Sequence, residues 1–190
     1  MVAVTQPKQP ATIADLDRTP DDGRRYELID GEIVVSAAPT WAHQYALRST
    51  FRLVDEWTQR LSLGEAMVAP FDIVLSPTRV VEPDVFVLPS DVDAHLRADG
   101  RYDGVPLLVV EVLSPTNRTH DTVTKLYHYA RAGIAEYWQV DPIARTVDIL
   151  RLDDGQYVPQ EIDEAGRVAS VVIPGLVVDP TTLFLPVGPA

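Results

Sequence analysis

The stretch Pro106-Leu107-Leu108-Val109-Val110-Glu111-Val112-Leu113 decides the fold, because it has the length and the branched apolar side chains of a β-strand buried on both faces. Such strands rarely carry a lone charge, so the carboxylate of Glu111 needs a cationic partner, a proton or a metal ion. A second acid, Asp84, follows Pro83 within another short β-branched run at residues 80–88. Two carboxylates on neighbouring strands can converge on one divalent cation. The sequence therefore predicts a functional site centred on Asp84 and Glu111.

The composition of the chain predicts a single globular domain. The chain has 190 residues, of which 46% are hydrophobic and 23% charged, and this suits one core with short tails. It has no cysteine, so a metal ion must be held by oxygen ligands, which favour magnesium, manganese or calcium, or by the four histidines. We expect residues 1–10 to be a disordered tail, residues 11–186 to form the domain, and residues 187–190 to be a loose C-terminus.

The net charge of -12 argues against a protein that grips nucleic acid through a large basic surface. It does not exclude a metal-dependent nuclease, because bound cations and a local basic patch can offset an acidic whole. Arginines do gather weakly at Arg24, Arg25, Arg48, Arg52 and Arg60, either as such a patch or as an ordinary solvated surface. The chain shows neither the apolar core of a signal peptide nor a membrane span, so we expect a soluble, cytoplasmic protein without membrane contact.

The order of the predicted elements indicates an α/β fold, with helices packed around a mixed β-sheet. In the first half of the chain, the hydrophobic patterns and turn residues predict a short helix at 11–16, a hairpin at 26–35 around Asp30-Gly31, and a helix at 42–61 that ends at Gly64. Strands at 65–75 and 80–88, paired as a hairpin through 76–79, and a strand at 107–113 should follow. In the second half, we expect a helix that begins at Thr119 or Asp121 and ends at Gly133, strands at 135–140 and 145–152, and a small β extension with strands at 157–162, 168–173 and 176–178.

Six fragments, taken in this order, carry a resemblance to a known family: Tyr26-Glu27-Leu28-Ile29-Asp30-Gly31-Glu32, His43, Pro83-Asp84-Val85, Glu111-Val112-Leu113-Ser114-Pro115, Asp121 with Lys125 and Tyr129, and Gly133-Ile134-Ala135-Glu136-Tyr137-Trp138-Gln139-Val140-Asp141-Pro142. They resemble the Uma-two family of putative restriction endonucleases, a branch of the PD-(D/E)XK nuclease superfamily. The resemblance covers about residues 20–157. It implies a restriction-endonuclease-like core, whose mixed central sheet is flanked by helices and followed by the C-terminal β extension.

The resemblance also implies which residues form the site. In the superfamily, an Asp at a strand start and a Glu one strand later bind the metal ion, and a Lys stands two residues beyond the Glu. Here those positions are Asp84, Glu111 and Leu113, so the lysine is missing, and the resemblance suggests that Lys125 on the following helix replaces it. We expect Asp84, Glu111 and the backbone carbonyl of Val112 to bind Mg²⁺, with Mn²⁺ as an alternative.

Two further residues match family positions: Glu27 as an extra metal ligand, and His43 as a proton carrier or phosphate contact. Each candidate also has a structural interpretation. Asp84 can cap a turn, Glu111 can form a buried salt bridge with Lys125, and Lys125 can be solvated. Likewise, Glu27 can be an exposed hairpin acid and His43 a first-turn helix residue. His95, His120 and His128 are interpreted as surface residues, and Tyr137 and Trp138 as core.

The leading functional prediction is a magnesium-dependent endonuclease that hydrolyses DNA phosphodiester bonds. A homodimer is expected, because two symmetric active sites suit two antiparallel strands. A catalytically silent nuclease fold that serves as a binding or assembly module is the main alternative, since Leu113 stands where a lysine is usual. A third possibility is a nuclease for RNA or for a small phosphodiester, which needs a less basic groove.

Overall fold

The computed structural model describes residues 9–36, 38–114 and 120–186, and it places their strands in three sheets. The largest is six-stranded, in the order β10-β9-β8-β7-β6-β3. Its strands are β3 (Gly64–Val68), β6 (Val85–Pro89), β7 (Leu108–Val112), β8 (Glu136–Asp141), β9 (Thr146–Asp153) and β10 (Gln156–Pro159). Only β7 and β8 are parallel, so the sheet is mixed as predicted.

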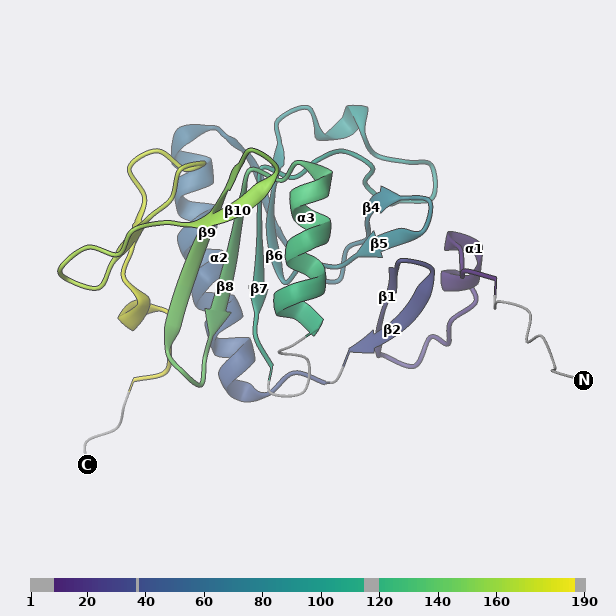
Figure 1. The fold of residues 1–190 in the computed structure, drawn as a ribbon, viewed down its shortest axis with the longest axis horizontal. Coiled ribbons are helices and arrows are strands. Elements are labelled where there is room, and N and C mark those ends of the chain that lie inside the picture. Colours follow the sequence, from purple (N-terminus) through teal and green to yellow (C-terminus); the bar gives the residue numbers. More distant parts are fainter. Residues whose placement is uncertain (1–8, 37, 115–119, 187–190) are drawn as a thin grey trace, which may run out of the picture.

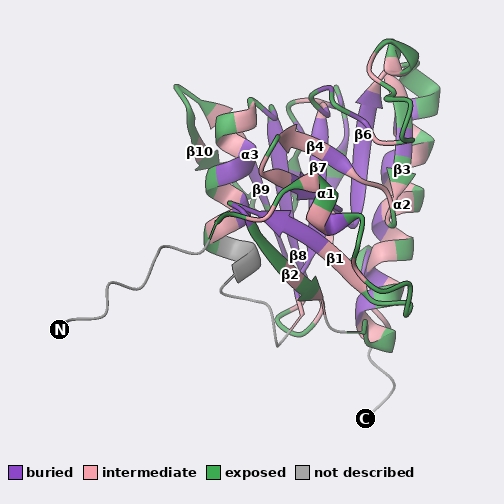
Figure 2. Ribbon diagram, turned by 90° about the vertical axis from the view of Figure 1, so that its right-hand side faces the viewer, coloured by how far each residue is buried: buried purple, intermediate pink, exposed green. Residues whose placement is uncertain are grey.

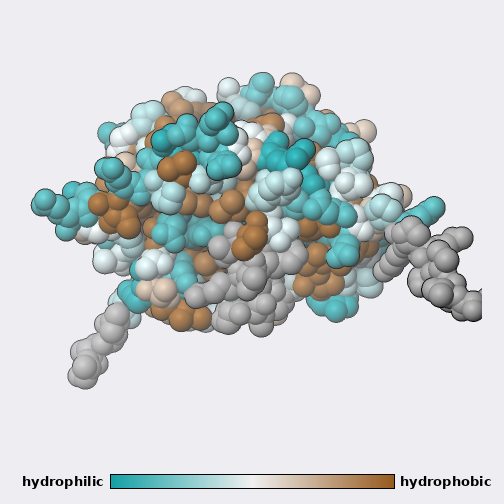
Figure 3. Space-filling view, in the orientation of Figure 1, coloured by the Kyte–Doolittle hydropathy of each residue, from teal (hydrophilic) through white to brown (hydrophobic). Residues whose placement is uncertain are grey.

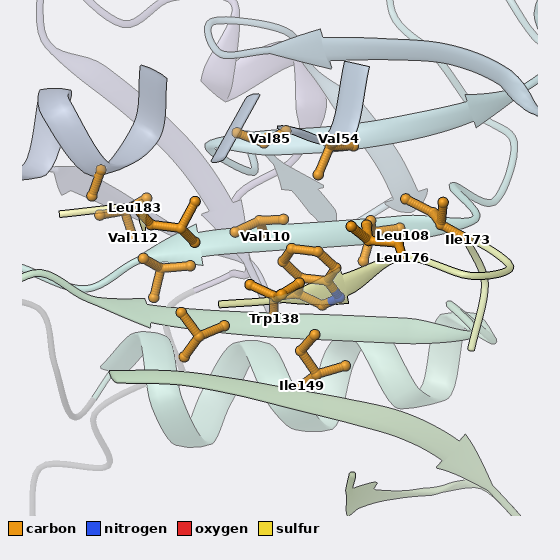
Figure 4. Close-up of a cluster of buried hydrophobic side chains, with 14 of the residues drawn as sticks. Val54, Val85, Leu108, Val110, Val112, Trp138, Ile149, Ile173, Leu176 and Leu183 are labelled. Carbon is orange, nitrogen blue, oxygen red and sulfur yellow. The ribbon is translucent and has the colours of Figure 1, made fainter. Parts of the chain in front are cut away.

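The helix α2 (Trp41–Leu61) covers one face of this sheet, and α3 (Leu126–Ala132) lies on the other (Figures 1 and 2). Ala46 and Val54 of α2 pack on side chains of β6, β7 and β8, of which Trp138 is the largest. Figure 4 shows Trp138 in the middle of this cluster, between the sheet and residues of the C-terminal extension. Strands buried on both faces are near-continuous apolar runs, which is why β7 stands out in the sequence.

A second sheet, ordered β2-β1-β5-β4, packs beside α3 on the same side of the large sheet (Figure 1). Its strands are β1 (Arg25–Ile29), β2 (Glu32–Ser36), β4 (Ile73–Ser76) and β5 (Arg79–Val81), and the short helix α1 (Ile13–Leu16) packs on its β1–β5 side chains. Asp30 and Gly31 both have positive φ in the tight β1–β2 turn, as the predicted Asp-Gly hairpin requires. Ile29, Ile73 and Val81 join the two sheets through a common core.

The hairpin predicted from residues 65–75 and 80–88 is divided between the two sheets, so that part of the prediction is wrong. β3 pairs with β6 in the large sheet, whereas β4 pairs with β5 in the second sheet. The breaks fall at Pro70 and Pro83, between the strands. Proline lacks the N–H that continues a strand ladder, which explains both breaks. The second break leaves Asp84 at the start of β6.

Of the two helix ends predicted from glycines, one is wrong and one is confirmed. Gly64 does not end α2 as predicted, since Ser62 forms the left-handed cap at φ 53° and Gly64 already belongs to β3. Gly133 does cap α3, with φ 80°. A π-helical segment, η2 (His120–Lys125), precedes α3, so the predicted helix is present in two parts. The proposed start at Thr119 and the side chain of Asp121 lie outside the described residues.

The strands of the C-terminal β extension are shorter than predicted. It contains β11 (Val168–Ala169), β12 (Val177–Val178) and the 3₁₀ turn η3 (Pro180–Thr182), and another 3₁₀ turn, η1 (Val92–Ala94), follows β6. Val168, Ile173 and Leu176 of the extension pack into the α2 core. The predicted tail at 1–10 and terminus at 187–190 fall almost entirely outside the described ranges.

The described helices and one face of the surface show how apolar side chains are distributed. Among the described residues, no helix combines the length and hydrophobicity that a membrane crossing needs. On the face that carries α3, hydrophobic side chains form small areas separated by hydrophilic ones (Figure 3). The architecture is therefore the predicted α/β fold, with a mixed central sheet, flanking helices and a C-terminal β extension.

Candidate functional site

The register of β6 and β7 brings Asp84 and Glu111 to the same end of the large sheet. Val85 pairs with Val110 in this antiparallel ladder, so Asp84, one residue before Val85, stands opposite Glu111. Both carboxylates are almost completely buried. Their convergence follows from the strand break at Pro83, which starts β6 directly after Asp84.

Glu27 and Lys125 extend this pair into a buried ionic cluster. The Lys125 ammonium lies 3.0 Å from Oε1 of Glu27 and 3.0 Å from Oε1 of Glu111, and its side chain is only 1% exposed. Glu27 also accepts a hydrogen bond from the backbone N–H of Glu82 at 2.8 Å. Glu27 is therefore not an exposed hairpin acid, nor is Lys125 solvated. The salt bridge between Glu111 and Lys125, weighed as a structural interpretation, is present.

Tyr129 follows Lys125 by four residues and so lies on the same side of the helix. Its hydroxyl donates a 2.5 Å hydrogen bond to Oε1 of Glu111, the oxygen that also accepts from Lys125. Burial raises the pKa of the Tyr129 hydroxyl well above its usual value, and the neighbouring charge of Glu111 raises it further. Tyr129 therefore keeps its proton and supports the charged form of Glu111.

The two oxygens of Asp84 have different partners. Oδ2 accepts from the backbone N–H of Val112 at 2.8 Å and lies 3.4 Å from Nε2 of His43, whereas Oδ1 accepts from Nη1 of Arg25 at 2.8 Å. Burial alone would raise the pKa of Asp84, but His43, Arg25 and the Val112 N–H together lower the pKa well below its usual value. Asp84 is consequently a stable carboxylate at neutral pH.

His43 reaches this site from the first turn of α2. The hydroxyl of Thr40 caps the helix by accepting from the His43 backbone N–H at 3.2 Å, which fixes the start of the helix beside the strands. Nδ1 of His43 is buried and has no hydrogen-bond partner among the described residues. His43 thus lies in the first turn of α2 and also beside Asp84, and its role as a proton carrier or phosphate contact stays a prediction.

Arg25 and Glu82 belong to the site, although the sequence interpretation did not place them there. Arg25, the first residue of β1, bonds to Asp84, and its pKa is raised by Asp84, Glu27 and Glu111 against the lowering effect of burial. Glu82 is buried, and burial together with the charge of Asp72 raises its pKa to about 7. A usable signal existed for Arg25, because it lies two residues before Glu27 on the same strand, and side chains two residues apart point to the same face of a strand.

Several other sequence predictions about this region can be placed. Leu113 is buried and its backbone N–H donates to Val140, so this position supplies no charge to the site. Tyr137 and Trp138 are core residues, as predicted. His128 is buried, so its interpretation as a surface residue is wrong; α3 turns it toward the second sheet, where Nε2 lies 3.1 Å from Asp30.

Of the two remaining histidines, His95 is the one with a described side chain, and it adds no ligand to the cluster. His95 is a partly exposed side chain near Asp103, and the side chain of His120 lies outside the described residues.

The donor chemistry of the cluster fits a hard divalent cation. Glu27, Asp84 and Glu111 offer carboxylate oxygens, and Val112, whose side chain is in the core, can contribute only its backbone carbonyl. No group of three or more metal-ligating side chains arranged to hold an ion occurs within the described ranges. A cation here would therefore rely on two carboxylates, a carbonyl and water, and it would compete with Arg25 and Lys125.

Comparisons with known proteins identify the family and a similar fold. A family described as Uma-two, putative restriction endonuclease, matches residues 13–183. The fold is similar to the crystal structure of a putative nuclease from Anabaena variabilis, with a TM-score of 0.75 and 17% sequence identity over 92% of this chain and 98% of that one. No curated protein shows significant sequence similarity.

Proposed function

The chain belongs to the Uma-two family, and from this premise we propose that it is a cation-dependent endonuclease that hydrolyses phosphodiester bonds of DNA. The observation that carries the proposal is the buried ionic cluster, in which Lys125 lies between Glu27 and Glu111, and Asp84 pairs with Arg25. Placing charges this deeply is costly, and replacing such a cluster with apolar residues is often neutral or stabilising. A reaction that needs these groups accounts for the cost.

Asp84 and Glu111, with the Val112 carbonyl, would hold Mg²⁺ or Mn²⁺. Such a cation, when bound, lowers the pKa of a water molecule and stabilises negative charge on a phosphate. The ammonium group of Lys125 lies between Glu27 and Glu111, and from this position it can orient a water or neutralise a phosphate oxygen. His43 can carry a proton at Nε2, the atom that faces Asp84.

DNA is the proposed substrate despite the net charge of -12. Positive charge near the site comes from Arg25 and Lys125, which reduces the repulsion of a phosphate locally. We further propose that two copies act together, one on each strand. Sedimentation of the purified protein at micromolar concentration should give a dimer, and a single monomeric species would contradict this part of the proposal.

A silent binding module is the second candidate, because the carboxylates are already paired with Arg25 and Lys125 and because Leu113 replaces a lysine. Cleavage assays separate the two functions. Supercoiled plasmid, single-stranded DNA and RNA should be incubated with the protein in Mg²⁺, in Mn²⁺ or in chelator. We expect cation-dependent cleavage of DNA, and preferential cleavage of RNA would change the substrate but not the chemistry.

Asp84→Asn and Glu111→Gln should each lower the cleavage rate by roughly 10³-fold or more, because each removes a carboxylate that holds the cation. Glu65→Gln is the matched control, since Glu65 is an exposed acid on β3 and should retain full activity. Equal residual cleavage in all four proteins would identify a contaminating nuclease. Cation binding without any cleavage would favour the silent module.

A further inference from the structure

Arg25 is the more exposed member of its ion pair with Asp84. Its side chain is 24% exposed, whereas that of Asp84 is 3% exposed. Nη1 donates to Oδ1 of Asp84, and Nε is buried with no acceptor among the described residues. Within the described part of the chain, Asp84 is the only hydrogen-bond partner of this guanidinium. A guanidinium has five N–H donors, so most of the donor capacity of Arg25 is unused.

The two oxygens of Asp84 differ in the groups that hold them. Oδ2 of Asp84 is fixed from within the fold by the Val112 N–H and lies next to His43. Among the described residues, Arg25 is the only hydrogen-bond partner of Oδ1. A divalent cation that binds Asp84 through Oδ1 competes with the positively charged Arg25 for that oxygen, and a released guanidinium stays on the short β1 strand beside the site.

The chemistry of the guanidinium indicates what it meets after release. Arg25 carries a permanent positive charge and a planar set of N–H donors, and a phosphodiester carries its negative charge on oxygen atoms. Arginine binds such oxygens through paired, charge-assisted hydrogen bonds.

We propose that Arg25 is a phosphate-binding residue that covers Asp84 in the cation-free protein and moves from Asp84 to the substrate phosphodiester when a divalent cation binds. This inference rests on the proposed function, because it requires a cation at Asp84 and a phosphodiester beside it. It assigns Arg25 two exclusive partners, so its removal has opposite effects on cation binding and on substrate turnover.

The test uses the full chain with Arg25→Gln, Arg25→Lys and the matched control Arg24→Gln. Arg24 is the adjacent residue, but its side chain is 58% exposed and is paired with Asp22. Calorimetric titration with Mn²⁺ measures cation affinity without substrate. Cleavage of a single-stranded oligonucleotide at saturating Mn²⁺ then gives kcat/KM for each protein.

Arg25→Gln should bind Mn²⁺ several-fold more tightly than the parent protein, because the competing guanidinium is gone, and its kcat/KM should fall by about 10- to 100-fold. Arg25→Lys keeps the charge and guards against a folding defect; it should bind Mn²⁺ nearly as the parent does but should still lose turnover, because an ammonium lacks the planar fork. Arg24→Gln should change neither value.

Weaker Mn²⁺ binding by both Arg25 variants, or full turnover in either, would overturn the inference while leaving the nuclease proposal in place. A parent protein that takes up no Mn²⁺ and cleaves nothing would instead overturn both.

Discussion

At the scale of single residues, the notable choice is lysine in a chain that otherwise uses arginine. The sequence contains two lysines, Lys8 and Lys125, and Lys125 is buried between two carboxylates. A compact ammonium with three donors can serve Glu27 and Glu111 from one point, whereas a planar guanidinium needs more room. The rarity of lysine in the sequence singles out Lys125 as a candidate site residue. Helix geometry alone did not predict that its side chain is buried.

Lys125→Met should destabilise the cation-free protein by about 3–5 kcal/mol, because Glu27 and Glu111 would remain buried without their shared partner. Denaturant titration in chelator measures the loss. Adding Mg²⁺ should recover part of it, since a cation that binds only the folded state stabilises it. Arg131→Met, on the exposed side of α3 where Arg131 stacks on Tyr127, is the control and should change little. Equal losses of stability in Lys125→Met and Arg131→Met would show that Lys125 does not offset the cost of burying Glu27 and Glu111.

At the scale of elements, the ends of helices and strands position the site more than their middles do. Asp84 precedes β6, His43 lies in the first turn of α2, and Lys125 ends η2. End residues combine a fixed backbone with a side chain that can project beyond the regular element. The other end of α2 is less favourable, because Ser62 adopts the left-handed conformation that suits glycine.

Ser62→Gly should raise the free energy of unfolding by up to about 1 kcal/mol, because glycine has no Cβ to strain at positive φ. The shift in melting temperature should be a few degrees, measured by circular dichroism. Ser62→Ala keeps the Cβ and should be neutral or slightly destabilising. If glycine and alanine behave alike at this position, the left-handed cap is not the origin of the effect.

At the scale of the whole molecule, the C-terminal extension is part of the core and is tied to it by one carboxylate. Glu136 on β8 is fully buried and accepts hydrogen bonds from Trp138 at 2.6 Å, from the hydroxyl of Ser170 at 2.7 Å, and from the backbone N–H groups of Val171 and Val172 at 2.5 and 3.2 Å. The argument used for Glu111 applies to this acid too, since Glu136 is a buried charge at the start of a mostly apolar strand that carries one other acid, Asp141. It is nevertheless structural, because the donors around it hold the extension on the sheet.

Glu136→Gln should destabilise the fold by roughly 2 kcal/mol or more, because an amide replaces one acceptor oxygen with a donor that faces other donors. Hydrogen exchange should accelerate first in residues 168–178, whereas Mn²⁺ affinity at Asp84 should not change. Glu161→Gln, an exposed acid, is the control. Uniform loss of protection over the whole chain would mean that the extension is not a separate unit of stability.

The fold was largely predictable, because β7, α2 and the β1–β2 turn carry strong local patterns. The distribution of strands between two sheets was not, because residues 64–76 and 79–89 fit one long hairpin equally well until the prolines interrupt it. At the site, Asp84 and Glu111 were found from the conflict between charge and burial. The strand alternation from Glu27 points to the face on which Arg25 lies, but the contact of Arg25 with Asp84 and the burial of His128 depend on long-range packing, which no local pattern encodes.

The cluster has one consequence for cooperativity. Glu27 is supplied by the four-stranded sheet, Asp84 and Glu111 by the six-stranded sheet, and Lys125 by the segment before α3. Neither sheet by itself contains all four side chains, so a ligand that needs all of them can bind only when both sheets and this segment are folded together. Ligand binding should therefore be lost at the same denaturant concentration at which tertiary structure is lost. The bound ligand should also slow hydrogen exchange in both sheets to the same degree.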